Sequence, residues 1–396
     1  MKKVGYKQTI YACYIGYIVQ AIINNLGPLL FLTFEKSLGI PIEKIGMLIT
    51  INFGVQIIVD LLSARYVDRV GYRNSITLAH VFATIGLIGM GIFPFIFSDP
   101  FVGLALASMI NAVGGGIIEV LISPIVEAAP SKEKDKAMSM LHSFYCFGHV
   151  AVVLLSTLAF YILGIDNWRF ICMIWAIVPF LNIFLFSIVP INTVTEEGAE
   201  LPLKQLLSIK LFWIFVLLMI CSGASEQAMS QWASFFAEDG LKVSKTMGDL
   251  LGPCAFALLM GCSRAFYGKY GSKINLKKFI LGSSILCIIS YLIAVLSPIP
   301  LIGLLGCALC GLSVGIMWPG TFSIAAKECP NGGTSMWALL ALAGDVGCFV
   351  GPSLVSIVSS INIGTGIKYG LGYAIIFPVI MFMLTLKMIV RKITKI

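Results

Sequence analysis

The chain has 396 residues, of which 58% are hydrophobic and 12% charged, and its formal net charge is +8. Soluble globular domains carry about 25% charged residues, so this composition excludes a soluble globule. Twelve apolar stretches reach the roughly 20 residues that a spanning helix needs, and they leave no room for a soluble domain. We therefore expect an all-α integral membrane protein with 12 transmembrane helices.

The predicted spans follow one another along the whole chain. The first is too long for the core of a signal peptide and has no small-residue cleavage site after a short apolar run, so we predict that it is not cleaved. The spans are, approximately, 8–34, 45–64, 75–97, 100–128, 138–164, 168–190, 209–237, 246–267, 277–297, 300–326, 334–360 and 368–390.

Lysine and arginine predict the orientation of these spans, because cytoplasmic loops of membrane proteins are enriched in both. If both termini are cytoplasmic, all but six of the 27 basic residues lie on the inner side. We therefore expect a multi-pass protein of the cytoplasmic (inner) cell membrane, embedded in the lipid bilayer. The positive charge is then a topology signal, and no nucleic-acid partner is expected. The outer basic residues are Lys36, Lys44, Arg169, Lys242, Lys245 and Lys368.

Cysteine and histidine argue against an enzyme or a metal protein. The eleven cysteines occur singly within the spans, and we interpret them as small hydrophobes rather than disulfides or metal ligands. Only three histidines are present, and we find no nucleophile–base pair, metal-ligand cluster or phosphate-binding loop. No enzymatic activity, cofactor or metal is expected.

Two basic, turn-forming phrases lie about 200 residues apart, each between the second and third apolar segments of its half. They read Ser63-Ala-Arg-Tyr-Val-Asp-Arg-Val-Gly71 and Ser263-Arg-Ala-Phe-Tyr-Gly-Lys-Tyr-Gly271. Ser123-Pro124 and Trp318-Pro319 repeat at nearly the same offset. A parallel internal repeat in an apolar chain is typical of a transporter built from two membrane halves. The predicted halves are 1–190 and 209–396, each of six helices, with a cytoplasmic linker at 191–208.

Four carboxylates lie within the predicted spans. A charged side chain at the centre of a membrane costs at least ~2.5–3.5 kcal/mol on insertion scales, so it needs a partner, water or a function. Glu119 in the fourth span and Glu226 in the seventh are therefore candidates for groups that load and release a proton. Asp60 is assigned to gating or topology, and Asp345 has no specific assignment.

Further polar and aromatic residues accompany these carboxylates. His142 and His149 lie two turns apart in the fifth span, and His142 is a further candidate proton carrier because histidine titrates near neutral pH. Aromatic rings stack on the apolar face of a sugar, a role that suits Trp232 and Trp318. The alternative is that each polar group only satisfies a neighbouring helix. The candidate substrate contacts are Gln20, Asn24, Asn25, Glu119, Gln227, Gln231, Trp232 and Trp318.

Three motifs in the spans occur together in one family. The fourth span has Glu119-Val-Leu-Ile-Ser-Pro124, the tenth has Gly315-Ile-Met-Trp-Pro-Gly-Thr-Phe-Ser323, and the first has Asn24-Asn-Leu-Gly-Pro28. They resemble Glu-Thr-x-x-Asn-Pro, Ser-Ile-Met-Phe-Pro-Thr-Ile-Phe-Ser and Asn-Asn-Leu-Asn-Asp of the fucose–galactose–glucose:proton symporter branch of the major facilitator superfamily. The phrase at 63–71 resembles that superfamily's loop between helices 2 and 3.

The resemblance implies a major facilitator fold of two six-helix halves, in which helices 1, 4, 7 and 10 line a central cavity. Pro124 and Pro319, in the fourth and tenth spans, are the expected hinges. The loop after the second span latches the two halves in this superfamily, and Glu127 is then a candidate partner for Arg65. The implied gating residues are Arg65, Asp68, Arg69, Arg73 and Glu127.

One departure from the branch affects proton coupling. Its helix 1 aspartate, implicated in coupling together with the helix 4 glutamate, is Pro28 here. Coupling through carboxylates on helices 1 and 4 is therefore excluded. Either Glu119 works with Glu226, or the protein is a uniporter, or its substrate differs.

These observations predict a secondary active transporter of a small polar solute, a sugar, taken up with protons by alternating access of the two halves. The alternative within transport is a proton-coupled exporter of drugs or metabolites, which predicts a more apolar cavity than Gln20, Asn24 and Gln231 supply. The alternative from another class is a non-transporting membrane sensor. It would need a signalling domain, for which the spans leave no room.

Overall fold

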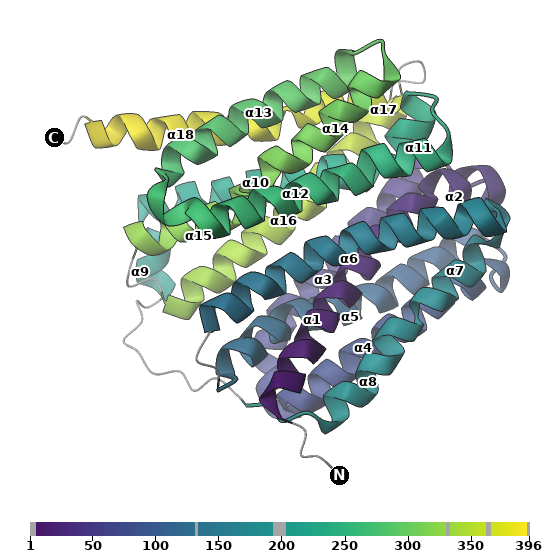
Figure 1. Ribbon diagram of the computed structural model, residues 1–396, viewed down its shortest axis with the longest axis horizontal. Helices are drawn as coiled ribbons and strands as arrows, with labels where there is room; N and C mark the ends of the chain where they lie inside the picture. Colours follow the sequence, from purple (N-terminus) through teal and green to yellow (C-terminus); the bar gives the residue numbers. More distant parts are fainter. Residues whose placement is uncertain (1–4, 131–133, 193–202, 330–332, 362–365, 394–396) are drawn as a thin grey trace. The chain divides into compact units, whose positions relative to one another are not determined.

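A computed structural model describes residues 5–130, 134–192, 203–329, 333–361 and 366–393 (Figure 1). Across these ranges the ordered elements are helices and no strand occurs. Twelve helical stretches are long and apolar enough to cross a membrane, one for each predicted span. The prediction of an all-α protein with 12 transmembrane helices is confirmed.

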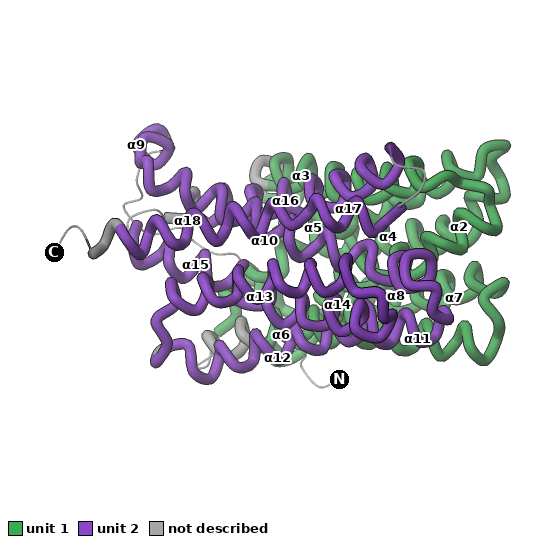
Figure 2. The backbone as a smooth tube through the Cα atoms, turned by 90° about the horizontal axis from the view of Figure 1, so that it is seen from above, with its two compact units in different colours: residues 1–195 green, residues 196–396 purple. Residues whose placement is uncertain are grey.

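The chain divides into two compact units, residues Met1–Thr195 and Glu196–Ile396 (Figure 2). Each unit contains six of the candidate spans. Of the predicted linker, residues 193–202 lie outside the described part of the chain, and its last residues form the short helix α9.

The described residues of unit 1 form eight α-helices and three short 3₁₀ turns. The turns η1 and η2 continue the helices that they adjoin, so that the first span runs from Tyr6 to Leu38. The helices are α1 (Tyr6–Asn25), α2 (Phe31–Leu38), α3 (Ile42–Val70), α4 (Tyr72–Ile92), α5 (Pro100–Ala128), α6 (Lys134–Leu163), α7 (Trp168–Trp175) and α8 (Ile177–Ile188), and the turns are η1 (Gly27–Leu30), η2 (Phe93–Phe95) and η3 (Ile165–Asn167).

Unit 2 differs from the described part of unit 1 in having two π-helical turns. One lies at the end of its first span and one within its second span. Such turns are rare and occur frequently at functional sites. The helices are α9 (Leu203–Ser208), α10 (Lys210–Phe235), α11 (Lys245–Asp249), α12 (Ala255–Tyr270), α13 (Leu276–Leu296), α14 (Pro300–Val314), α15 (Met317–Glu328), α16 (Gly333–Ile361), α17 (Gly366–Ala374) and α18 (Ile376–Ile393); the turns are η4 (Phe236–Gly240, π), η5 (Leu250–Cys254, π) and η6 (Gly271–Lys273, 3₁₀).

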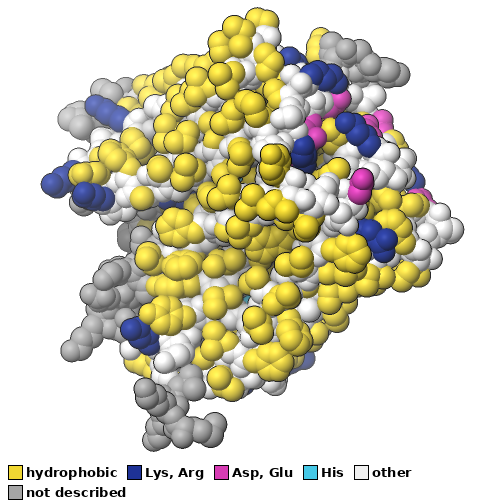
Figure 3. Space-filling view, turned by 45° about the vertical axis from the view of Figure 1, so that its right-hand side comes forward, with side chains coloured by type: hydrophobic (Ala, Val, Ile, Leu, Met, Phe, Trp, Pro, Cys, Tyr) yellow, Lys and Arg dark blue, Asp and Glu magenta, His cyan; other side chains and the backbone are white. Residues whose placement is uncertain are grey.

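Large apolar side chains cover much of the surface. Ile58, Leu158, Phe184 and Leu305 each expose more than half of their area. On the face drawn in Figure 3, hydrophobic side chains predominate and charged ones gather toward the edges. Soluble monomers rarely expose apolar patches of this extent. This surface suits the hydrocarbon core of a membrane.

Small residues bring the helices of unit 2 close together. A Cβ atom on Gly351 of α16 would lie 2.5 Å from the Ala224 carbonyl oxygen of α10, and one on Gly347 would meet the Ile220 carbonyl. Only glycine fits at such contacts, as is usual between helices in membranes. This packing fixes the rotation of α10, and with it the direction of the polar side chains that α10 carries.

The two expected proline hinges differ in structure. The fourth span, α5, continues as one helix through Pro124 to Ala128, so the break expected there is absent. The tenth span is interrupted at Gly315 and Ile316, between the end of α14 and the start of α15. Of the two spans, only the tenth therefore has a local irregularity, and the backbone of Gly315 and Ile316 there keeps right-handed helical angles.

The basic phrases expected to form turns are instead the ends of long helices. α3 extends to Val70 and α12 to Tyr270, which adds about two turns to the predicted second span and about one turn to the eighth. The turn after α3 is confined to Gly71, whose φ of 85° favours glycine. Arginine, lysine and tyrosine are ordinary helix residues, and a helix at a membrane surface continues through them.

Candidate functional site

A polar network in unit 1 joins three helices at the level of Glu119. Gln20 on α1 donates its Nε2 to Glu119 Oε2 on α5 at 3.1 Å and to Gln56 Oε1 on α3 at 3.0 Å. Glu119 is half-buried, whereas Gln20 and Gln56 expose 3% and 2% of their surface. The carboxylate that was predicted from the fourth span thus accepts a hydrogen bond from an amide of the first.

The network continues along α1 and α3. Gln56 Nε2 and Asn52 Nδ2 both donate to Asn24 Oδ1, at 3.1 and 3.2 Å. A Cβ atom on Gly115 of α5 would lie 3.0 Å from Gln20 Oε1, so the glycine leaves room for the amide. We call Gln20, Asn24, Asn52, Gln56 and Glu119 the amide network.

One acceptor of the amide network has no partner. Gln20 Oε1 is buried and makes no hydrogen bond to any described residue. A buried polar atom without a partner is costly, on the order of 1–3 kcal/mol, and calls for an explanation such as a bound ligand or water.

Other predicted residues of unit 1 lie beside the amide network. Asn25 bonds the Ala21 carbonyl of its own helix at 2.9 Å and so stays outside it. Tyr17 joins Ser123 through their hydroxyl oxygens at 3.0 Å. The exposed His142 on α6 lies with its ring centroid 5.6 Å from that of Tyr17. This contact of His142 is therefore with Tyr17, which is not a member of the amide network.

Unit 2 carries a polar row on α10 that meets an arginine. Gln231 Nε2 donates to Gln227 Oε1 at 3.0 Å, and Gln227 Nε2 donates to Glu226 Oε1 at 3.3 Å. The other oxygen of Glu226, Oε2, lies 3.5 Å from Nη2 of Arg264 on α12. Three polar residues predicted on the seventh span, Glu226, Gln227 and Gln231, therefore bond to one another, and the row ends in an ion pair.

The two candidate tryptophans have different surroundings. Trp232 on α10 has no exposed surface, and its Nε1 donates to the Pro352 carbonyl of α16 at 3.1 Å. Trp318 on α15 is half-buried and packs against Gly344 of α16. Of these two tryptophans, only Trp318 has exposed surface.

The candidate gating residues are partly outside the described side chains. The side chains of Arg65 and Asp68 lie outside the described part. Arg69 and Glu127 are exposed. Arg73 is well placed: its guanidinium donates to the carbonyls of Phe186, Ser187 and Val189 at 2.9, 2.8 and 2.7 Å. It therefore caps the C-terminus of α8, where a cation also suits the helix dipole.

We expect Arg73→Ala to lower the stability of the protein by about 1–2 kcal/mol, because three carbonyls at the end of α8 lose a charged donor. Thermal unfolding of the detergent-purified protein measures this. Arg73→Lys, which keeps the charge without the planar fork, should fall between the parent and the alanine variant. An unchanged unfolding temperature in Arg73→Ala would show that the cap contributes nothing.

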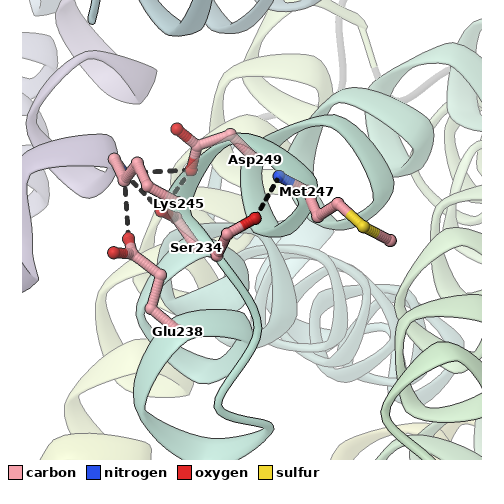
Figure 4. Close-up of polar contacts among 6 residues, drawn as sticks. Ser234, Glu238, Lys245, Met247 and Asp249 are labelled. Atoms are coloured by element: carbon pink, nitrogen blue, oxygen red, sulfur yellow. Dashed lines mark hydrogen bonds and ion pairs between the residues drawn. The ribbon is translucent and has the colours of Figure 1, made fainter. Parts of the chain in front are cut away.

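A second charged cluster lies where α10 ends and α11 begins, and Figure 4 shows Lys245 between Glu238 and Asp249. Lys245 Nζ lies 2.9 Å from Ser234 Oγ, 3.0 Å from Asp249 Oδ1 and 3.1 Å from Glu238 Oε1. Ser234 Oγ also donates to Asp249 Oδ1 at 2.5 Å. The Asp249 side chain has no exposed surface. We call these four residues the lysine cluster.

Sequence reasoning missed Asn52, Gln56 and Arg264. Asn52, Gln56 and Asp60 recur every four residues in the second span, and this polar stripe on one helix face was a usable signal. Arg264 had no such signal, because it belongs to a phrase interpreted as a turn. Within the described residues, no group of three or more histidine, cysteine or acidic side chains is arranged to hold a metal ion.

The described residues include twelve candidate membrane spans, divided equally between two units. Each unit carries polar side chains within its spans. This is the architecture of a multi-pass membrane transporter. Residues 13–352 match the family model of the Major Facilitator Superfamily. The chain belongs to this superfamily. It is a transporter rather than an enzyme, as its family indicates.

Solved structures with the same fold include several solute transporters. A D-xylose–proton symporter is 14% identical with a TM-score of 0.77, and the match covers 96% of each chain. The E. coli fucose:proton symporter is 15% identical with a TM-score of 0.66, covering 96% of this chain and 98% of that one. The nucleoside transporter NupG is 14% identical with a TM-score of 0.75, covering 97% and 98%. No curated protein matches the sequence.

Proposed function

We propose that this protein takes up a small polar solute, a sugar, together with protons, as a secondary active transporter of the cytoplasmic membrane with both termini in the cytoplasm. The observation that carries the proposal is the amide network with its free acceptor, Gln20 Oε1. Amides and a carboxylate supply both donors and acceptors, which is what recognition of several hydroxyl groups requires. Two of the similar structures are sugar–proton symporters, which supports the same assignment.

The proposed solute contacts are polar side chains of each unit. Gln20, Asn24 and Glu119 are the proposed contacts in unit 1, and Gln227 and Gln231 are those in unit 2. Trp318 is partly exposed, and its ring is the proposed surface on which the apolar face of a sugar stacks. Trp232 takes a packing role, because α16 covers its ring and accepts its N–H. Asn25 supports α1 through its bond to Ala21.

Glu119 is the proposed proton carrier. It accepts its hydrogen bond from a neutral amide, and a protonated carboxyl group at the same place can donate to a solute oxygen instead. Glu226 is the second candidate and has Arg264 beside it. His142, exposed next to Tyr17, is the third. Arg65, Asp68, Arg69 and Glu127 keep their proposed gating role.

Uptake into proteoliposomes tests the proposal. The purified protein is reconstituted with a pyranine pH indicator inside, and a panel of radiolabelled pentoses, hexoses and nucleosides is offered with and without an inward proton gradient. We expect a sugar to accumulate above its outside concentration only when the gradient is present. Accumulation of a nucleoside alone, or gradient-driven loss of a preloaded lipophilic drug, would replace the sugar assignment by nucleoside uptake or by export.

Gln56 should affect solute affinity although it was not predicted to line the site. It bridges Gln20 and Asn24, so Gln56→Leu leaves both amides without this partner. Displacing the two amides should weaken solute binding by about 1–3 kcal/mol. This loss corresponds to roughly a 5- to 150-fold rise in KM for the transported sugar. Gln56→Asn is the matched control, because it keeps an amide on α3, and its KM should lie between those of the parent and the leucine variant. A parental KM in Gln56→Leu would show that the amide network does not bind solute.

A further inference from the structure

Arg264 touches two elements of unit 2, the helix α10 and the interruption of the tenth span. Its Nη2 lies 3.5 Å from Glu226 Oε2 on α10, and its Nε donates to the Gly315 carbonyl at 3.4 Å. Both distances are at the long end for contacts of a charged donor, which are usually about 2.7–2.9 Å. The side chains of Arg264 and Glu226 are 18% and 9% exposed. The contact is thus largely buried but not tight.

The Gly315 carbonyl lies at the interruption of the tenth span. α14 ends at Val314 and α15 begins at Met317, so Gly315 and Ile316 separate the two helices. α12 approaches this point so closely that a Cβ atom on Gly315 would lie 2.8 Å from both the Met260 carbonyl oxygen and Ser263 Cβ. In membrane proteins, interrupted helices at depth are tolerated where other groups satisfy their backbone, and they often form ion and solute sites.

We propose that Arg264 is a positioning residue that links the protonation of Glu226 to the opening of the α14–α15 break. This inference rests on the proposed function, because it assigns a role in the transport cycle to a residue beside the same polar row. With Glu226 ionised, the guanidinium is attracted to the carboxylate and stays where its Nε meets the Gly315 carbonyl. A proton on Glu226 removes that attraction and frees the break.

The physical basis is the difference between a charged and a neutral partner. At low dielectric constant, the attraction between opposite charges a few ångströms apart is large, and it vanishes when one of them is neutralised. A single proton therefore changes the free energy of the contact enough to shift the equilibrium between the closed and the open break. Coupling free energies of this kind typically change such an equilibrium constant by about 5- to 150-fold. The loose geometry of the pair suits a contact that must break and re-form.

Other titratable groups on the elements around α10 define the necessary controls. Tyr291 on α13 donates to the Ser225 carbonyl at 2.8 Å, and Asp345 is buried on α16. The lysine cluster lies at the end of α10, and Lys368 of α17 is half-buried. The remaining groups on these elements include thiols, the two tyrosines of α17 and exposed charged side chains. Among them are Cys221, Cys254, Cys287, Cys307, Cys310, Cys348, Lys204, Lys210, Lys327, Glu328, Tyr369, Tyr373 and Lys387.

Hydrogen–deuterium exchange of the purified protein tests the link without any substrate. Protection factors for the amides of residues 311–320, corrected for the intrinsic effect of pH on exchange, are measured across a pH series. The parent should lose protection in this segment by about 10-fold as Glu226 takes up its proton. Glu226→Gln should show low protection of residues 311–320 at every pH. Arg264→Gln, and the variant that carries both substitutions, should show the same low protection.

Two further variants separate positioning from a merely structural role. Arg264→Lys keeps the charge but replaces the fork by a point donor, so it should retain the pH dependence with less protection at high pH. Asp345→Asn should keep the parental pH dependence. The link is overturned if protection in the parent does not vary with pH, or if Arg264→Gln unfolds at a lower temperature yet retains the parental pH dependence. Because no solute is present, either result leaves the sugar uptake experiment to be judged separately.

Discussion

We expect Glu119→Gln to abolish uphill accumulation of the transported sugar while exchange of labelled for unlabelled sugar across the membrane persists. Glutamine has the shape of glutamate and can still accept the hydrogen bond from Gln20 Nε2, which is 3.1 Å from Glu119 Oε2 in the parent. It cannot bind and release a proton. Solute binding and the conformational change therefore survive, whereas the link to the proton gradient is lost.

The measurement is a pair of assays on the same proteoliposomes. With an inward proton gradient, the inside sugar concentration in Glu119→Gln should stop at the outside concentration, and sugar-driven acidification of the interior should be absent. Counterflow without a gradient should remain within a few-fold of the parental rate, about 1 kcal/mol or less in activation free energy. Glu43→Gln, an exposed glutamate in the first turn of α3, is the matched control and should behave as the parent. Normal accumulation by Glu119→Gln would assign the proton to Glu226 or His142.

The spans were predictable because length and apolarity are sufficient to recognise them. Their ends were not, since a helix leaves the membrane without leaving its helical conformation. The predicted end of the second span at residue 64 and the observed end of α3 at Val70 illustrate this. The continuity of α5 through Pro124 is a related case, because helices in membranes tolerate proline when neighbouring groups satisfy the freed carbonyl.

The polar groups were recognisable one helix at a time, but their partners were not. Glu119 and Gln20 are conspicuous within apolar spans, and the structure joins them directly. That Gln56 connects Gln20 to Asn24 depends on how α3 is rotated against α1. The ring of Trp232 points to α16 for the same kind of reason: glycine contacts between α10 and α16 set the rotation of α10. Such rotations follow from packing between helices distant in sequence.

The lysine cluster should be a major contributor to the stability of unit 2. Lys245 is the one cation among its four members, and it contacts both carboxylates and a serine. Removing one partner from a buried ion pair costs about 3–5 kcal/mol, because the remaining charge is left uncompensated. We therefore expect Lys245→Ala to lower the free energy of unfolding by that amount, since Glu238 and Asp249 both lose the lysine that they share.

The order of effects within the cluster gives the sharper test. Glu238→Gln removes the surplus negative charge and leaves the Lys245–Asp249 pair, so it should cost least. Asp249→Asn leaves the Lys245–Glu238 pair, but it changes the acceptor shared by Lys245 and Ser234. Its loss of stability should therefore be intermediate. Lys242→Ala is the matched control nearby, because its pair with Asp239 is 76% and 41% exposed and such surface pairs contribute little. Thermal unfolding in detergent ranks the four variants. If Lys245→Ala and Lys242→Ala unfold at the same temperature, the cluster does not hold the α10–α11 connection together.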